Sequence, residues 1–259
     1  MSVTGDFLLF MNISYKLYLY LNLQMTQVER FTSNYFTYQF ETPLRMLLVA
    51  PSGSGKTYRL FKIIENARYM FDNPIQFETV IYYYSTWTTT FTMYEHLVTE
   101  WVNKLPSEEE FIQKMNRYKD KGGCVMIFDD FMTEMTQDIV NIYTKYSRNK
   151  NTSVITLWQD LFPKGKKRVS EICRTLSLSA TDILIFKNVR DKTQFRFFAR
   201  QFMPDCFREL TRSFNRVTNE PYRYMWFNMR TNVDNKFRVL SNVCYDEWPL
   251  KIYDFDVDY

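Results

Sequence analysis

Short apolar runs alternate with longer amphipathic stretches from about residue 42 to residue 203. The apolar runs have the length of buried strands, and the amphipathic stretches repeat with the period of a helix. Strands that alternate with helices predict an α/β fold, in which helices cover both faces of a mostly parallel sheet. The predicted strands are 44–50, 79–84, 124–130 and 152–158, and the predicted helices are 56–69, 107–119 and 134–146.

A chain of 259 residues with 46% hydrophobic content indicates one globular domain with appendages. We expect an N-terminal extension over residues 1–41, a core over 42–203, and a C-terminal part over 204–259. Residues 1–24 are too short and too polar to span a membrane, and they lack the features of a secretory signal. Met25 is an alternative start that would make these residues an upstream extension, and a strand that packs on the core is the other interpretation.

The C-terminal part contains a predicted helix at 205–215 and strand-like runs at 222–227 and 237–240. These elements are expected to lengthen the sheet or to cover it. Aromatic residues beside arginines in the run 222–227 are compatible with stacking on single-stranded bases, but alternation in a strand favours core packing. The acidic, aromatic end of the chain is expected to be a fraying terminus.

The composition argues against several kinds of site. The four cysteines, at positions 124, 173, 206 and 244, are too far apart for paired metal ligands, and they indicate a reducing environment rather than a disulfide scaffold. The single histidine, His96, argues against a multi-histidine metal site and a histidine-based catalytic cluster.

The first motif directly follows a predicted buried strand. Residues 50–57 read Ala-Pro-Ser-Gly-Ser-Gly-Lys-Thr, a phosphate-binding loop of the Walker A type with Ala where the first Gly usually stands. In such a loop the backbone N–H groups converge on phosphate oxygens, a lysine adds positive charge, and a hydroxyl ligates Mg²⁺ at the start of a helix. The motif therefore predicts a site for ATP with Mg²⁺, formed by Ser52, Gly53, Ser54, Gly55, Lys56 and Thr57.

The second motif is a pair of carboxylates, Asp129 and Asp130, at the end of the apolar run 124–130. This is the form of a Walker B segment. Asp129 is expected to hold Mg²⁺ beside Thr57, and Asp130 is expected to orient and deprotonate the attacking water. An acidic turn is the alternative for an isolated pair, but the upstream phosphate loop favours hydrolysis.

A third polar position, Gln159, ends the predicted strand 152–158. In P-loop ATPases with an extra strand between the two Walker strands, a polar residue at this position contacts the γ-phosphate or the attacking water. A glutamine that caps a strand or faces solvent is the alternative, and the spacing alone leaves both interpretations open.

Taken in order, Lys56-Thr57, Asp129-Asp130 and Gln159 resemble the motifs of the FtsK-HerA superfamily. More narrowly, the chain resembles the poxvirus-type genome-packaging ATPases of Maverick/Polinton elements, adintoviruses and virophages. The resemblance covers roughly residues 40 to 253, and the segments 81–87, 151–162, 186–191 and 199–204 agree with it.

The resemblance implies a P-loop NTPase three-layer sandwich of the additional-strand, RecA-like type. It implies an ATPase that assembles in a homo-oligomeric ring, translocates double-stranded DNA and loads a genome into a capsid. A capsid or portal protein is the further partner implied, and no membrane is expected. The implied location is inside the host cell, in a virus factory or the nucleus, or in the virion.

The resemblance also implies an arginine finger that completes the neighbouring subunit's site. Arg148, eleven residues before Gln159, occupies the superfamily's finger position. The element-encoded branch often has a His pair followed by Arg in this loop, whereas this chain reads Ser147-Arg148-Asn149-Lys150, so Lys150 is a rival. Asp130 also departs from the wider superfamily, in which many members have Glu, although the packaging branch often shows two Asp.

Positive charge is concentrated in one part of the chain. Residues 163–240 contain 17 Lys and Arg against 7 Asp and Glu, whereas the rest of the chain contains 16 against 22. The densest cluster, at 164–168, is either a DNA contact near a central pore or a solvated loop. Arg208, Arg212 and Arg216 have the spacing of an exposed helix face.

Three other functions remain open from the sequence. A HerA-like helicase or recombination motor shares every motif above, so packaging rests on the family resemblance. A P-loop kinase would transfer phosphate to a small acceptor and would need no base directed at water, which Asp130 and Gln159 argue against. A nucleotide-binding assembly factor would need no intact Walker residues.

Overall fold

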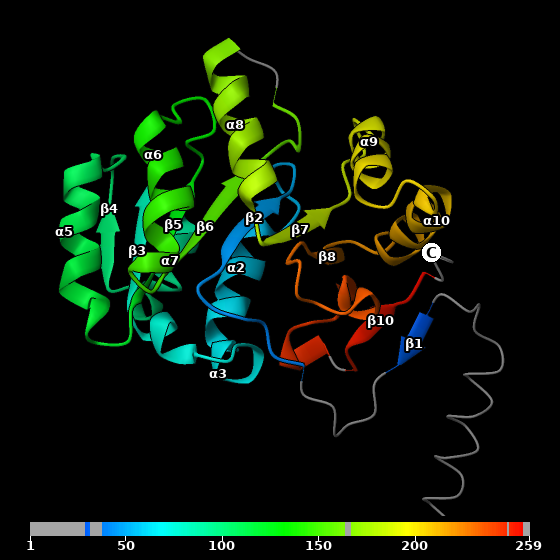
Figure 1. Cartoon of the computed structure of the whole chain (residues 1–259), viewed down its shortest axis with the longest axis horizontal. Coiled ribbons are helices and arrows are strands. Elements are labelled where there is room, and N and C mark those ends of the chain that lie inside the picture. The colour runs from blue at the N-terminus through cyan, green and yellow to red at the C-terminus, as the bar shows by residue number, and fades with distance from the viewer. Residues whose placement is uncertain (1–28, 32–37, 164–166, 248, 256–259) are drawn as a thin grey trace, which may run out of the picture.

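The computed structural model describes residues 29–31, 38–163, 167–247 and 249–255. In this part of the chain ten strands form one sheet, in the order β1-β10-β9-β8-β7-β2-β6-β5-β3-β4 (Figure 1). The strands from β7 to β4 in this order are parallel, and β8, β9, β10 and β1 continue the sheet in antiparallel fashion. The strand bounds are β1 (Glu29–Phe31), β2 (Arg45–Val49), β3 (Val80–Tyr84), β4 (Glu100–Val102), β5 (Cys124–Asp129), β6 (Thr152–Trp158), β7 (Asp182–Phe186), β8 (Tyr224–Asn228), β9 (Val239–Ser241) and β10 (Lys251–Tyr253).

The order of the central strands confirms the predicted α/β fold of the additional-strand type. β6 lies between β2, which precedes the phosphate loop, and β5, which ends in the two carboxylates. Every residue of β5 and β6 is buried, as expected for strands that helices cover on both faces.

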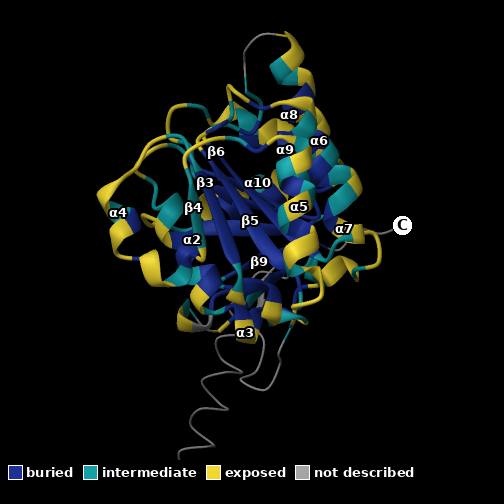
Figure 2. Ribbon diagram, turned by 90° about the vertical axis from the view of Figure 1, so that its left-hand side faces the viewer, coloured by how far each residue is buried: buried dark blue, intermediate teal, exposed yellow. Residues whose placement is uncertain are grey.

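Helices cover the sheet in two layers, with one hydrophobic cluster under each layer. Phe61 of α2 belongs to the cluster on one face, and Phe111 and Met115 of α5 belong to the cluster on the other. Figure 2 shows the buried sheet between α2 and the helices α5 to α8. The helix bounds are α2 (Lys56–Glu65), α3 (Ala67–Met70), α4 (Thr89–Thr92), α5 (Glu108–Lys119), α6 (Gln137–Asn141), α7 (Ser147–Asn149), α8 (Lys167–Ser179), α9 (Thr193–Phe202) and α10 (Phe207–Val217), with a π-helical turn at Ile142–Tyr146 and 3₁₀ turns at Pro74–Glu78, Glu95–Leu97, Asn235–Phe237 and Tyr245–Glu247.

Most predicted elements occur where the pattern placed them, with differences at their ends. The predicted strand at 152–158 is confirmed as β6, and the capping box at the start of α5 is confirmed by reciprocal hydrogen bonds between Ser107 and Glu110. The predicted helix 56–69 is interrupted at Asn66, whose side-chain amide donates to the Lys62 carbonyl and ends α2. The predicted helix 134–146 begins only at Gln137, and the predicted strand 124–130 ends at Asp129.

The C-terminal strands lengthen the sheet and also contact the helix that follows the phosphate loop. A buried ion pair of 2.7 Å joins Arg59 of α2 to Glu247. The strand predicted at 222–227 begins at Tyr224, and the Tyr224 and Trp226 side chains are buried as predicted. Tyr222 was predicted in the same strand, but it precedes β8 and is exposed. The alternating aromatic pattern did not reveal that the strand starts two residues later.

Some predictions concern residues that the structure does not describe. Residues 1–24, with the alternative start, lie outside them, as do residues 164–166 of the basic cluster. No described helix has the length and apolar character needed to cross a bilayer. The four cysteines are buried free thiols, and His96 is exposed. The division at residues 41 and 203 stays a prediction.

Candidate functional site

The residues that the motifs single out gather at one edge of the sheet. Because β2, β5 and β6 are parallel, they end at the same edge, which we call the carboxyl edge. The register pairs Val49 with Trp158 and Asp129 with Leu157. The phosphate loop after Val49, the carboxylate pair and Gln159 therefore meet at this edge, although about 100 residues separate the first from the last.

The phosphate loop has the backbone conformation that its glycines permit. Gly53 and Gly55 have φ of 79° and 84°, in the left-handed region that residues with a Cβ rarely adopt. The Ser54 hydroxyl donates to the Pro51 carbonyl, and the Ala50 N–H donates to the Trp158 carbonyl at 2.9 Å. α2 then starts at Lys56 with no side chain of the described residues capping its first turn. Its N-terminal N–H groups are therefore available to an anion.

Asp129 is the buried carboxylate of the pair, with 8% of its surface exposed. Its Oδ2 accepts a hydrogen bond of 2.7 Å from the Tyr82 hydroxyl, and among the described residues no donor reaches Oδ1. Burial raises the pKa of Asp129 above its usual value, while the positive charge of Lys56 and the Tyr82 hydrogen bond oppose this shift. An additional cation at this carboxylate would favour its ionised form.

Asp130 and Gln159 contact each other in front of the strand ends. Asp130 has φ of 62°, which turns the chain out of β5 and leaves the side chain exposed. The Gln159 Nε2 donates to Asp130 Oδ1 at 3.0 Å. The second carboxylate oxygen of Asp130 therefore remains accessible to water, beside the phosphate loop.

Arg148 and Lys150 lie at the opposite edge, where the parallel strands begin and which we call the amino edge. Both precede β6, whose seven residues place this edge roughly 20 Å from the carboxyl edge. The Lys150 ammonium donates to Asn116 Oδ1 at 2.8 Å. Arg148 is exposed, and its guanidinium forms no hydrogen bond or ion pair with any residue in the described ranges. Neither side chain reaches the phosphate loop of its own subunit.

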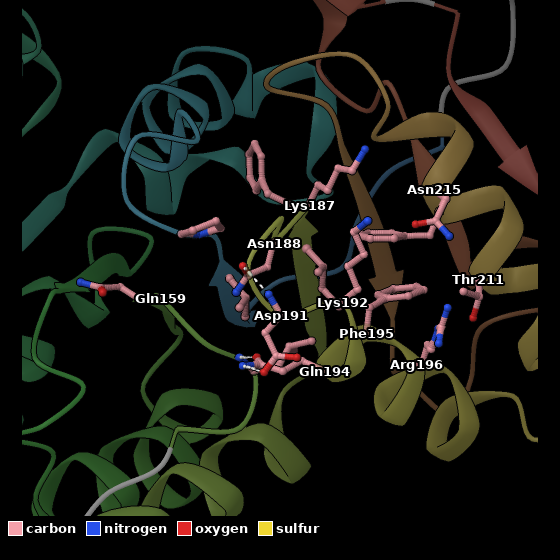
Figure 3. A pocket seen from close by; sticks show the side chains of 16 residues that line it. Gln159, Lys187, Asn188, Asp191, Lys192, Gln194, Phe195, Arg196, Thr211 and Asn215 are labelled. Carbon is pink, nitrogen blue, oxygen red and sulfur yellow. Dashed lines mark hydrogen bonds between the residues drawn. The ribbon is translucent and has the colours of Figure 1, made fainter.

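Two residues of the site carry no motif signal in the sequence. Tyr82, in the middle of β3, donates to Asp129. Gln194, in α9, connects the loops after β6 and β7: its Nε2 donates to Asp160 and Asp191, and its Oε1 accepts from the Leu161 N–H at 2.9 Å. Figure 3 shows Gln194 beside Asp191. Only the tertiary structure identifies them, because their partners are distant in the sequence.

A cleft of about 840 Å³ opens beside the phosphate loop. Three segments form most of its wall: the loop itself, the segment 187–191 after β7, and the segment 218–223 before β8. Three cations line it, Lys187, Arg190 and Arg223, together with three carboxylates, those of Asp160, Asp191 and Glu220. Arg223 pairs with Glu220 and Glu247, whereas the Lys187 and Arg190 side chains have no hydrogen-bond or ion-pair partner among the residues described. The cleft has the size of a ligand site, and Lys187, Arg190 and the phosphate loop suit the anionic part of a ligand.

The donors at the carboxyl edge fit a magnesium ion held partly by phosphate. No group of three or more His, Cys, Asp or Glu side chains that suits a metal occurs in the described part of the chain. Thr57 and Asp129 offer hydroxyl and carboxylate oxygens, the hard ligands that Mg²⁺ prefers, and Mg²⁺ commonly takes its remaining ligands from substrate phosphates and water.

Comparisons with known proteins identify the family. The model of the family described as "Poxvirus A32 protein" matches residues 29–195, more than half of the chain. A search of curated protein sequences found no significant match.

Among solved structures, the chain is similar to the genome packaging NTPase B204 from Sulfolobus turreted icosahedral virus 2. In the complex with ATP-gammaS the identity is 15%, the match covers 73% of this chain and 93% of B204, and the TM-score is 0.48. In the complex with AMPPCP the identity is 13%, the coverage is 80% and 95%, and the TM-score is 0.49. EssC (ATPases 2 and 3) from Geobacillus thermodenitrificans matches at 11% identity, over 84% of this chain and 40% of that chain, with a TM-score of 0.42.

The family match confirms the resemblance to poxvirus-type packaging ATPases that the sequence motifs indicate. The matched range contains the phosphate loop, the carboxylate pair and Gln159. The chain belongs to the poxvirus A32 protein family.

Proposed function

We propose that this chain is the ATPase subunit of a genome-packaging motor, which hydrolyses ATP to move double-stranded DNA into a capsid. The observation that carries the proposal is the contact between Gln159 and Asp130 at the edge where the Lys56 charge acts on Asp129. In a member of the poxvirus A32 family, this arrangement suits hydrolysis of a bound triphosphate.

The phosphate loop and α2 bind the triphosphate of ATP. Backbone N–H groups of the loop and of the first turn of α2 donate to phosphate oxygens, and Lys56 neutralises their charge. Thr57 and Asp129 hold Mg²⁺, which supplies further charge neutralisation at the phosphates when it is bound. The Tyr82 hydrogen bond fixes the Asp129 carboxylate, so that Oδ1 faces the ligand rather than rotating freely.

Asp130 acts as the general base. It accepts one proton from the attacking water through the carboxylate oxygen that Gln159 leaves free, while the water oxygen forms the new bond to the γ-phosphorus and ADP leaves. Gln159 fixes the orientation of Asp130 and senses the γ-phosphate. Gln194 holds the loop that carries Gln159, because it binds that loop at Leu161 and Asp160.

Arg148 completes the site of a neighbouring subunit in a ring. It lies roughly 20 Å from its own phosphate loop, which excludes an action within its own subunit. Its guanidinium has no partner in the described part of the chain, whereas the rival Lys150 is bound to Asn116. This difference supports Arg148 as the finger. A guanidinium placed at a transferring phosphoryl group stabilises the charge that develops there.

The basic region supplies the contact with DNA. Lys167 and Arg168 are exposed at the start of α8, which follows the Gln159 loop. Contacts of lysine and arginine with phosphates bind DNA without regard to sequence and weaken as salt rises. Packaging would take place inside the host cell, in a virus factory or the nucleus, and a capsid or portal protein would receive the DNA.

The test is ATP hydrolysis by the purified protein with and without double-stranded DNA, over a series of salt concentrations. We expect stimulation by DNA that fades with salt and that disappears in Lys56→Ala. Lys119→Ala removes an exposed lysine at the end of α5 and serves as the matched control. Turnover that ignores DNA would contradict the motor and favour a phosphotransferase, and no turnover under any condition would favour an assembly factor.

A further inference from the structure

The segment 218–223, between α10 and β8, lies beside the phosphate loop because of the sheet topology. β8 is antiparallel to β7, and its first residue, Tyr224, pairs with Phe186, the last residue of β7. The chain therefore enters β8 at the carboxyl edge. Tyr222 and Arg223 stand directly before this point, at the mouth of the cleft.

Tyr222 covers the last glycine of the phosphate loop. A Cβ built on Gly55 would lie 2.9 Å from Cδ1 of the Tyr222 ring, so this ring is in direct contact with the loop backbone just before Lys56. The Tyr222 backbone is left-handed, with φ of 64°, which is uncommon for a bulky residue. The chain holds the ring in this place at a cost in backbone strain.

The Tyr222 ring is positioned but not packed into the core. It is 63% exposed, and it makes no ring contact, cation–π contact or side-chain hydrogen bond with any residue that the structure describes. Neighbouring aromatic residues behave differently, since Tyr224 and Trp226 are fully buried. An exposed aromatic face that lies against the loop, without an aromatic or charged partner among the described residues, is a surface suited to a planar ligand.

The cleft that this ring lines also contains groups that suit phosphate. Ser52, Gly53 and Ser54 form the floor on the side of the loop, and Lys187 and Arg190 add positive charge from the segment after β7. The volume of about 840 Å³ is sufficient for a whole nucleoside triphosphate. A ligand that is anionic at one end and planar and aromatic at the other matches this distribution.

We propose that Tyr222 stacks on the nucleobase of the bound nucleoside triphosphate, and that the segment 218–223 is the base-binding wall of the site. The inference rests on the proposed function, because the phosphate loop must hold the triphosphate end. Stacking on an aromatic face is available to every base, and it is strongest for the larger ring system. The site therefore takes purine nucleotides in preference to pyrimidine nucleotides, and it selects by the face of the base rather than by its edge.

Tyr58 is the rival aromatic residue, since it directly follows Thr57 and is 48% exposed. It does not line the cleft, and the Lys62 ammonium lies 5.7 Å from the centre of its ring. Tyr58 thus belongs to the outer face of α2, and Tyr222 is the aromatic residue that faces the cleft.

The experiment compares the dissociation constants of ATP and of inorganic tripolyphosphate by isothermal titration calorimetry. Tyr222→Gly removes the ring and suits the positive φ, so the variant should fold at least as stably as the wild type. We expect its ATP affinity to fall about tenfold, with tripolyphosphate affinity unchanged. Tyr222→Phe keeps the ring and should bind both ligands as the wild type does. Tyr58→Ala is the matched control and should bind both ligands as the wild type does.

Three outcomes would overturn the inference. The first is wild-type ATP affinity in Tyr222→Gly. The second is an equal loss of ATP and tripolyphosphate affinity in this variant, which would show that the ring maintains the conformation of the phosphate loop and does not bind the base. The third is a selective loss of ATP affinity in Tyr58→Ala instead. In all three the proposed function survives if Lys56→Ala abolishes ATP binding. If the wild type binds neither ligand, both the base-binding wall and the ATPase proposal fail.

Discussion

The amino and carboxyl edges of the parallel sheet each carry a carboxylate, and the two carboxylates differ in burial and in their partners. At the amino edge Asp182 is 1% exposed, and its carboxylate accepts from Thr181 at 2.8 Å and from the Trp226 indole at 2.9 Å. Arg230 follows at 3.8 Å. At the carboxyl edge Asp130 and Gln159 are exposed, and among the described residues their side chains form hydrogen bonds only with each other.

The buried charges at the amino edge stabilise the fold, whereas the exposed charges at the carboxyl edge are free to bind a ligand. A buried charge is tolerated only when it is paired and hydrogen-bonded, and the Asp182 carboxylate finds these partners within the subunit. Burial raises the pKa of Asp182, and Arg230 and the two donors oppose this shift. The carboxyl edge lacks such compensation because solvent or substrate supplies it. Arg148 is the exception at the amino edge, since it is exposed and unpaired within the described ranges.

Arg148→Ala should have the largest effect on activity. If this residue completes a neighbouring site, hydrolysis by the assembled protein should fall by about 10³-fold or more, because its charge stabilises the transition state. Lys150→Ala should stay near the wild-type rate, since Lys150 is bound to Asn116.

A mixing experiment tests whether Arg148 acts between subunits. Arg148→Ala and Lys56→Ala subunits are each inactive alone, but a mixture should recover part of the activity, because one supplies the guanidinium and the other the intact loop. Full activity of Arg148→Ala alone would show that Arg148 has no catalytic role and that the charges at the amino edge serve only the structure.

Asp182→Ala should destabilise the fold at the amino edge. The change leaves the Trp226 indole without its acceptor and removes one of the two carboxylates beside Arg230, which keeps Glu41, so the free energy of unfolding should fall by about 3 kcal/mol. Urea denaturation measures this change. ATP affinity of the folded fraction should be unchanged, and a variant as stable as the wild type would show that the cluster contributes little.

Asp130→Asn should reduce ATP hydrolysis at the carboxyl edge without destabilising the fold. The amide retains the shape of the carboxylate but cannot accept a proton, so kcat should fall by about 10²-fold or more. Stability should change by less than about 0.5 kcal/mol, because Asp130 is exposed. Single-turnover hydrolysis and ATP binding separate the two effects. Asp120→Asn, an exposed carboxylate at the end of α5, is the control.

The effect of Asp129→Asn on the stability of the nucleotide-free protein should be small, and it is visible in the pH dependence of stability. Burial raises the folded-state pKa of Asp129 above its unfolded value, so the ionised carboxylate destabilises the nucleotide-free protein at neutral pH. The neutral variant should be the more stable of the two at neutral pH. As pH falls through the folded pKa and then the unfolded pKa, the wild-type carboxylate is protonated and the difference should vanish. A difference that grows with acidity would contradict this sign.

Local patterns in the sequence were sufficient to predict much of the structure of this molecule. The strand 152–158, which is rich in β-branched residues, the capping box of α5 and the small residues around Lys56 each depend on neighbours within a few positions, and each is confirmed in the structure. The position of β6 was also expected, because the family resemblance implied an extra strand between the two that end in the phosphate loop and the carboxylates.

What the sequence alone determined was therefore the fold class, the family motifs and the set of candidate residues. The tertiary structure decided which of them meet: Gln159 contacts Asp130 only because β6 lies beside β5, and Tyr82 and Gln194 join the site through partners far away in the chain. It also separated Tyr222 from the strand that its aromatic pattern predicted. A single left-handed residue changes where a side chain points, and no periodicity records such a change.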